Sequence, residues 1–110
     1  SFSDYSTTEQ NTGRLWIDGK TIYRKEINLG SLTDSTPKHV PHGIANLSTV
    51  VNLSGFVTNG NVFLPLPLAR YNNFASQIGL FANLTDIVVE PGNDRTAYTG
   101  YVVIEYTKTV

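Results

Sequence analysis

The chain has 110 residues, which is enough for one domain with a substantial hydrophobic core. Charged residues make up only 15% of the chain, the net charge is -1, and the basic residues are scattered. Nucleic-acid binding and docking on an anionic membrane both need clustered positive charge. We therefore expect no nucleic-acid partner and no electrostatic membrane docking, and a surface rich in Thr, Ser and Asn.

The chain contains no cysteine, so it has no disulfide framework and no thiolate site. This composition fits folding in a reducing cytoplasm. The apolar runs are too short for a signal peptide or a membrane span, so no membrane insertion is expected. Because the chain begins with Ser1 and lacks Met, we expect a processed chain or a fragment of a longer protein.

Residues 1–13 are polar and show no apolar periodicity. They are predicted to form an N-terminal linker or surface arm, with Phe2 and Tyr5 as its anchors. Residues 14–110 are predicted to form a single β-sandwich domain.

Residues 14–27 carry the first hairpin signal. The apolar run R-L-W-I precedes Asp18-Gly19, and the β-prone run K-T-I-Y-R-K-E-I-N follows it. An Asp-Gly pair between two such runs predicts a two-residue type I′ turn. In the second run, the face that carries Arg24 and Glu26 is expected to be in contact with water.

The middle of the chain is predicted to contain further strands. Residues 48–57 alternate as a strand does, and Asn59-Gly60 predicts a second hairpin. In residues 62–68, Pro65 and Pro67 each lack an N–H, so this segment is predicted to be an edge strand or an extended segment. A short strand is expected at residues 38–40.

The last third of the chain continues this pattern. Residues 75–83 are predicted to form a strand with a bulge at Gly79, and residues 85–90 another strand. The final run, residues 97–110, is apolar on both faces, so it is predicted to be central and covered on both sides by the core or by another subunit. The sum is seven or eight strands, which predicts an all-β antiparallel β-sandwich, jelly-roll-like or a small barrel.

The sequence carries no motif for catalysis. His39 and His42 alone do not make a zinc site, which needs three or four ligands, so no metal and no cofactor are predicted. No G-x-S-x-G elbow occurs, and no pair of acidic residues stands in a context that would raise a carboxyl pKa. The chain is therefore predicted to have no catalytic residues and to be non-enzymatic.

Two polar clusters, Y-N-N at residues 71–73 and N-D-R at residues 93–95, are the most similar to recognition sites. An exposed Tyr can stack on a sugar face, while Asn, Asp and Arg can pair with sugar hydroxyls. The alternative is ordinary turn chemistry, which the same residue types provide. Trp16 also allows two interpretations. It packs in the core or against another subunit, or it forms a platform for a sugar ring. The predicted ligand-binding residues are Tyr71, Asn72, Asn73, Asn93, Asp94, Arg95 and Trp16.

Several stretches resemble a small C-terminal β domain of bacteriophage and prophage tail-fibre and receptor-binding proteins. They are Y-S-T-T-E-Q-N-T-G-R-L-W-I-D-G-K-T-I-Y-R-K, the tripeptide H-G-I, F-L-P-L-P, and the closing Y-V-V-I-E-Y-T-K-T. Together they span residues 5–109. The resemblance implies a virion component at the tail-fibre tip, folded in the host cytoplasm, homotrimeric, and in contact with a host cell-surface glycan.

The resemblance leaves the role of the domain open between host adhesion and a structural module. The domain either binds surface saccharides in receptor binding, or only trimerises or caps the fibre while adhesion is located elsewhere. An enzyme that trims surface glycan is a third class. Because the hairpin motif belongs to the resemblance, Trp16 is expected to pack rather than bind, which leaves the loops around Tyr71 and Asp94 as the predicted sugar contacts.

Overall fold

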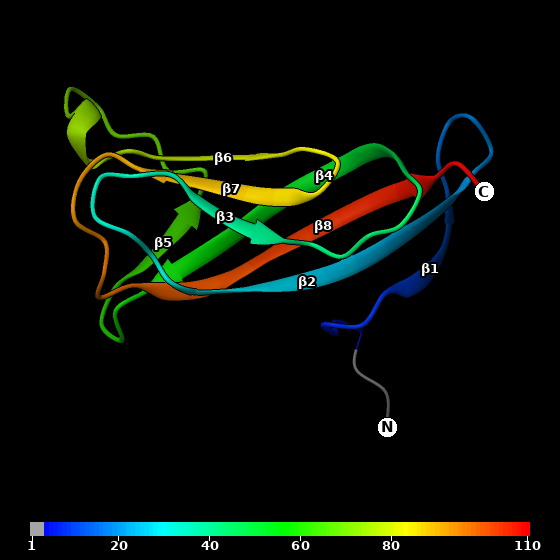
Figure 1. The fold of residues 1–110 in the computed structure, drawn as a ribbon, viewed down its shortest axis with the longest axis horizontal. Coiled ribbons are helices and arrows are strands. Elements are labelled where there is room, and N and C mark those ends of the chain that lie inside the picture. Colours follow the sequence, from blue (N-terminus) through cyan, green and yellow to red (C-terminus); the bar gives the residue numbers. More distant parts are fainter. Residues whose placement is uncertain (1–3) are drawn as a thin grey trace.

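The computed structural model describes residues 4–110, which form two antiparallel sheets packed face to face (Figure 1). The larger sheet has the strand order β1-β2-β8-β4-β5 and the smaller one the order β3-β7-β6. The predicted all-β antiparallel sandwich is confirmed. The elements are β1 (Gln10–Leu15), β2 (Thr21–Ser31), β3 (Lys38–Pro41), β4 (Leu47–Thr58), β5 (Phe63–Leu66), the short 3-10 helix η1 (Phe74–Ser76), β6 (Ile78–Ala82), β7 (Asp86–Pro91) and β8 (Thr99–Lys108).

Across residues 4–110, no helix reaches the length and apolarity that a membrane crossing would require.

Strand β8 lies between β2 and β4 in the larger sheet, as its two-sided apolar pattern predicted. Its residues Val102, Ile104 and Tyr106 point into the space between the sheets and are fully buried. Ile87 and Val89 of β7 meet them from the smaller sheet. The opposite face of β8 is only partly covered within the described chain, and Tyr101 on it is 39% exposed.

Two glycines let β4 and β8 approach unusually closely. A Cβ atom added to Gly100 would lie 1.9 Å from the carbonyl oxygen of Phe56, and one on Gly55 would lie 2.4 Å from that of Tyr101. Real Cβ atoms do not come this close to a backbone, so no other residue fits at either position without moving a strand.

The hairpin between β1 and β2 is present, but its predicted turn type is wrong. The Trp16 N–H donates to the Lys20 carbonyl at 2.8 Å and the Gly19 N–H to the Trp16 carbonyl at 2.9 Å. Gly19 has a φ of +83°, whereas Asp18 keeps a negative φ. The loop therefore has three residues and ends with Gly19 in the left-handed conformation. An Asp-Gly pair is compatible with this loop as well as with a type I′ turn.

Two further predictions concern glycine and proline. β5 with Pro65 is an edge strand, as predicted, and it follows β4 through the Asn59-Gly60 hairpin.

The predicted bulge at Gly79 is wrong, because β6 pairs with β7 in continuous register and Gly79 lies opposite Glu90. Gly79 instead leaves room for the Glu90 side chain, whose Oε1 would be 3.1 Å from an added Cβ.

The described part of the N-terminal segment lies along β2. The Glu26 N–H donates to the Ser6 carbonyl at 2.9 Å, and the Ser6 N–H donates to Glu26 Oε2 at 2.5 Å. The Arg24 guanidinium lies 4.6 Å from the ring centroid of Tyr5. The expectation of a wet Arg24 and Glu26 face is therefore wrong, since Glu26 is only 8% exposed. Phe2 lies outside the described residues.

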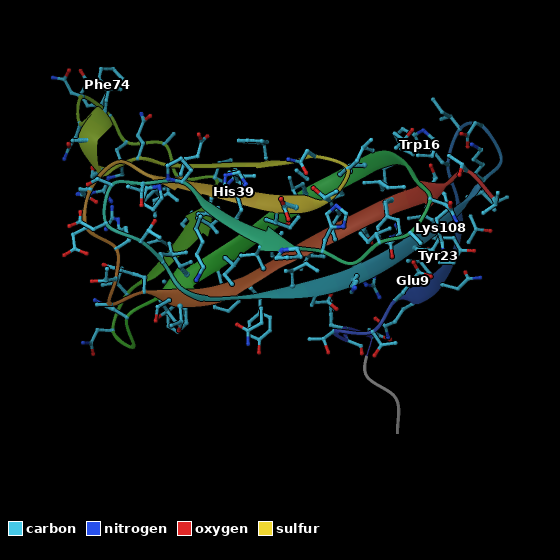
Figure 2. All side chains as sticks on the ribbon, viewed as in Figure 1. Glu9, Trp16, Tyr23, His39, Phe74 and Lys108 are labelled. Atoms are coloured by element: carbon cyan, nitrogen blue, oxygen red, sulfur yellow. The ribbon has the colours of Figure 1, made fainter. Side chains whose placement is uncertain are left out.

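Glu9 joins this segment to the end of β8. Tyr106 donates its hydroxyl to Glu9 Oε1 at 2.5 Å, and Lys108 Nζ lies 2.6 Å from Glu9 Oε2. The same ammonium lies 4.5 Å from the ring centroid of Tyr23, and Figure 2 shows Glu9, Tyr23 and Lys108 gathered at this end of the molecule.

These contacts shift two pKa values in opposite directions. Burial acts to raise the pKa of Glu9, but the hydrogen bonds from Lys108 and Tyr106 and the charge of Lys108 outweigh it, so the pKa lies below its ordinary value. Burial, followed by the hydrogen bond to Glu9, raises the pKa of Tyr106. The carboxylate and the neutral phenol therefore stabilise each other.

Replacing Glu9 tests this link through the pH dependence of stability. The contribution of Glu9 is fully present above its ordinary pKa of 4.5 and is lost as the pH falls from there through the lowered folded-state value. Glu9→Gln should lower the free energy of unfolding at pH 7 by about 1–2 kcal/mol. It should also flatten the fall in stability below pH 4.5, as measured by chemical denaturation at a series of pH values. Glu90→Gln, at an exposed position, is the control, and identical pH profiles for Glu9→Gln and the unmodified chain would refute the link.

Candidate functional site

The two loops that the sequence singled out lie together at one end of the sandwich. Residues 67–77 connect β5 to β6, and residues 92–95 follow β7; we call residues 69–77 and 92–95 together the tip surface. It lies at the opposite end of the molecule from the C-terminus and the β1–β2 hairpin (Figure 1). The structure thus brings together six of the seven predicted ligand-binding residues, namely Tyr71, Asn72, Asn73, Asn93, Asp94 and Arg95.

The larger of the two loops is closed at its base. The Leu68 N–H donates to the Ile78 carbonyl at 2.9 Å, and the Ile78 N–H donates back to the Leu68 carbonyl at 3.1 Å. Leu68 and Ile78 are both buried in the core. A loop of this length with adjacent, buried ends is a compact Ω-type loop, which holds its shape from a fixed base.

Arg95 ties the smaller loop to the larger one. Its Nη2 donates to the Ser76 carbonyl at 2.7 Å, and its guanidinium lies 5.2 Å from the ring centroid of Tyr98. The Gly92 N–H donates to the Gln77 carbonyl at 2.9 Å. An added Cβ on Gly92 would lie 2.6 Å from the Ala75 carbonyl oxygen, so the two loops are in close backbone contact. Arg95 therefore acts as a positioning residue for the larger loop.

Two aromatic rings project from the larger loop. Tyr71 is 97% exposed and Phe74 is 77% exposed, and Figure 2 shows Phe74 at the outer edge of the molecule. Asn72 adopts a left-handed φ of 55°, and the Asn73 carbonyl accepts the Ser76 N–H at 3.3 Å. The backbone of the two asparagines thus makes the turn while their side chains remain exposed. The sequence reasoning missed Phe74, although it, like Tyr71, is an aromatic residue that no turn requires.

Asp94 and Asn93 serve the smaller loop. Asp94 Oδ1 accepts the Thr96 N–H at 3.0 Å and the Thr96 hydroxyl at 2.8 Å. The backbone hydrogen bond from Thr96, followed by its hydroxyl, lowers the pKa of Asp94 and keeps it ionised. The Asn93 carbonyl accepts the Ser35 N–H at 3.2 Å. The Asp94 bonds are the local hydrogen bonding by which Asp stabilises turns, whereas the Asn93 bond is a long-range backbone contact.

Trp16 lies apart from the other predicted residues. It is half-buried beside the loop of the β1–β2 hairpin, at the opposite end of the molecule from Phe74 (Figure 2). Trp16 therefore cannot contact a small ligand that is bound at the tip surface.

The two histidines do not form a shared site. His42 is buried; its Nδ1 accepts the Ile44 N–H at 3.1 Å, so its Nε2 carries the hydrogen that faces the Asn83 carbonyl at 2.9 Å. His39 is exposed and lies 3.8 Å from the Asp86 carboxylate. Among residues 4–110, no three His, Cys, Asp or Glu side chains are grouped to hold a metal ion.

Comparisons of the chain with protein-family models, with curated proteins and with solved structures gave no match.

Arg95 offers a direct test of how the larger loop is held. Arg95→Ala removes the bond to Ser76 and should lower the free energy of unfolding by about 1–2 kcal/mol. It should also speed amide hydrogen exchange at Ser76 and Gln77, measured by NMR or mass spectrometry, because the loop then opens more often. Arg70→Ala, an exposed arginine in the same loop, should leave both quantities unchanged. Unaltered exchange in Arg95→Ala would show that the core-anchored base alone holds the loop.

Proposed function

We propose that this chain is a non-enzymatic β-sandwich domain from the tip of a bacteriophage tail fibre, and that it binds saccharides on the host cell surface. The tip surface is the observation that carries the proposal. It presents Tyr71 and Phe74 to solvent on a loop that is anchored to the core and to Arg95.

The exposure of these rings supports binding rather than folding. An aromatic side chain stabilises a fold when it leaves water, yet Tyr71 and Phe74 remain largely exposed. Their loop is held in place by other residues, so the rings are available to a ligand with little loss of conformational freedom on binding. The amides of Asn72 and Asn73 beside them can donate to and accept from hydroxyl groups, as a saccharide requires.

A site of this size would bind one saccharide weakly. A homotrimeric fibre tip carries one site on each subunit, and a cell surface presents the same saccharide many times. Simultaneous engagement of several sites raises the overall affinity by a factor of about 10²–10⁴ without any new contact.

Removing the exposed rings of the tip surface tests the proposal. The chain is displayed multivalently on beads or a streptavidin scaffold and screened against an array of bacterial surface polysaccharides. Tyr71→Ala combined with Phe74→Ala should lower the retained signal about tenfold or more, because each lost contact is multiplied by avidity. Leu84→Ala, which changes a 70% exposed residue in another loop, is the control for general surface effects. A silent array with the unmodified chain, or equal binding by the double variant, would refute the proposal.

The β1–β2 hairpin supports a second candidate function, a structural module that assembles the fibre. Leu15 is 67% exposed, Ile17 91% and Val110 90%, and Val110 lies in the groove that Gly19 and Lys20 also line. This apolar group projects from the end of the molecule opposite the tip surface, and the adjoining strand β1 is largely exposed. A projecting apolar hairpin suits insertion between subunits of a symmetric oligomer.

The solution mass separates this candidate from a monomeric domain. Sedimentation equilibrium of the unmodified chain should give a trimer mass at high concentration, and Ile17→Ser should shift the population toward monomer. Leu84→Ser should leave the mass unchanged. A strictly monomeric unmodified chain would exclude the hairpin as a sufficient assembly surface.

A further inference from the structure

The outer face of the five-stranded sheet carries a groove that is separate from the tip surface. It has a volume of about 440 Å³, which lies within the range of about 300–1,000 Å³ found for small-ligand sites. Strands β2, β8 and β4 form it, and none of its lining residues is charged. They are Asn28, Gly30, Ser31, Phe56, Thr58, Thr99, Gly100 and Tyr101.

Two glycines pair with each other across the strands that line the groove. Gly30 of β2 pairs with Gly100 of β8, so neither partner supplies a side chain at this point of the sheet. The next pairs on either side, Asn28 with Tyr101 and Ser31 with Thr99, do carry side chains. Both of these pairs line the groove on the outer face, whereas Gly100, which alternates with Tyr101 and Thr99 along β8, belongs to the opposite face; we call the space between the two pairs the hollow.

An aromatic wall borders this hollow. The rings of Phe56 and Tyr101 lie 6.5 Å apart between centroids with an interplanar angle of 31°, and Phe63 lies 6.2 Å from Phe56 on the other side. Phe56 is 40% exposed, Phe63 68% and Tyr101 39%. Since a whole aromatic side chain presents roughly 200 Å², the three rings together expose about 300 Å².

That area decides between a protein partner and a small ligand. A stable protein interface buries about 800 Å² on each partner, well above what this wall offers. Phe63 does not line the groove, so Phe56 and Tyr101 alone offer about 160 Å² of aromatic surface within it, which suits one sugar ring packed by its apolar face.

The rim supplies hydrogen-bonding groups without charge. Asn28 Oδ1 accepts the Gly30 N–H at 3.0 Å, and within residues 4–110 its amide nitrogen Nδ2 donates to no other group. Thr58 Oγ1 accepts the Gly60 N–H at 3.0 Å and keeps its own hydroxyl hydrogen to donate. On the same sheet face, Arg14 and Arg24 each pair with Glu105, and Glu26 accepts the Ser6 N–H and is buried.

We infer that this groove is a second saccharide site, which binds the face of an uncharged sugar ring against Tyr101 and Phe56. Asn28 Nδ2 and the Thr58 hydroxyl bind the ring's hydroxyl groups. The inference deepens the proposed function and rests on it, because it assigns the same domain a neutral ligand at a place other than Tyr71 and Phe74.

Titration with free glycosides tests the groove directly. The ¹⁵N-labelled 110-residue chain is titrated with the methyl glycosides of glucose, galactose, N-acetylglucosamine and rhamnose, and with glucuronate as the charged comparison. At least one neutral glycoside should shift the amide signals of Asn28, Gly30, Thr99 and Tyr101 in a saturable manner, while glucuronate should not.

Three variants separate the contacts from the fold. Tyr101→Leu keeps an apolar side chain but removes the ring, and it should weaken binding about five- to tenfold. Tyr101→Phe keeps the ring and should bind within about threefold of the unmodified chain. Asn28→Asp keeps the acceptor for the Gly30 N–H but removes the donor Nδ2, and it should weaken binding about tenfold. The dispersion of the amide spectrum reports whether each variant is folded.

The remaining outcomes overturn the inference in distinguishable ways. If glycosides shift only the signals of residues 70–76, the groove inference fails while the proposed saccharide binding stands. If no glycoside shifts any signal and the polysaccharide array is also silent, both fail. If no glycoside binds the groove but Tyr101→Leu lowers the oligomer mass, the face is a contact between copies of the chain and not a sugar site.

Discussion

The position of β8 between β2 and β4 is the constraint on which the rest of this structure depends. Alternate residues of a strand point to opposite faces, so a central strand must supply the core on one side and an outer surface on the other. In β8, Val102, Ile104 and Tyr106 fill the space between the sheets, while Tyr101 and Glu105 lie on the outer face. The core, the aromatic wall and the link to Glu9 all derive from this one strand.

The two ends of the molecule differ in how they are held. At the hairpin end, Glu9, Tyr106 and Lys108 join the N-terminal segment to the last strand through buried or half-buried polar contacts. At the tip, the Leu68–Ile78 pair and Arg95 hold a loop whose own side chains remain in solvent. The residues that hold the structure together are therefore largely different from the residues that are free to contact a ligand.

Much of the fold is readable from the sequence because strand alternation and turn residues are local signals. The central position of β8, the edge position of β5 and both hairpins follow from such patterns. The strand order does not, because register between distant strands leaves no local signal. The aromatic wall was missed for this reason, since Phe56 and Tyr101 are neighbours only through the β4–β8 register. Arg95 was predicted to contact a ligand, and its positioning role was missed because its bond to Ser76 joins two loops that are separate in the sequence.

The closed base of the tip loop has a consequence for evolution. Residues 71–74 contribute little to the core, and substitutions at such exposed positions usually change stability by no more than about 0.5 kcal/mol. The loop is instead held in its conformation by Leu68, Ile78 and Arg95. The exposed positions can therefore be exchanged while the sandwich stays intact, and if the proposed function holds, a change of ligand needs only a few substitutions in one short segment rather than a new fold.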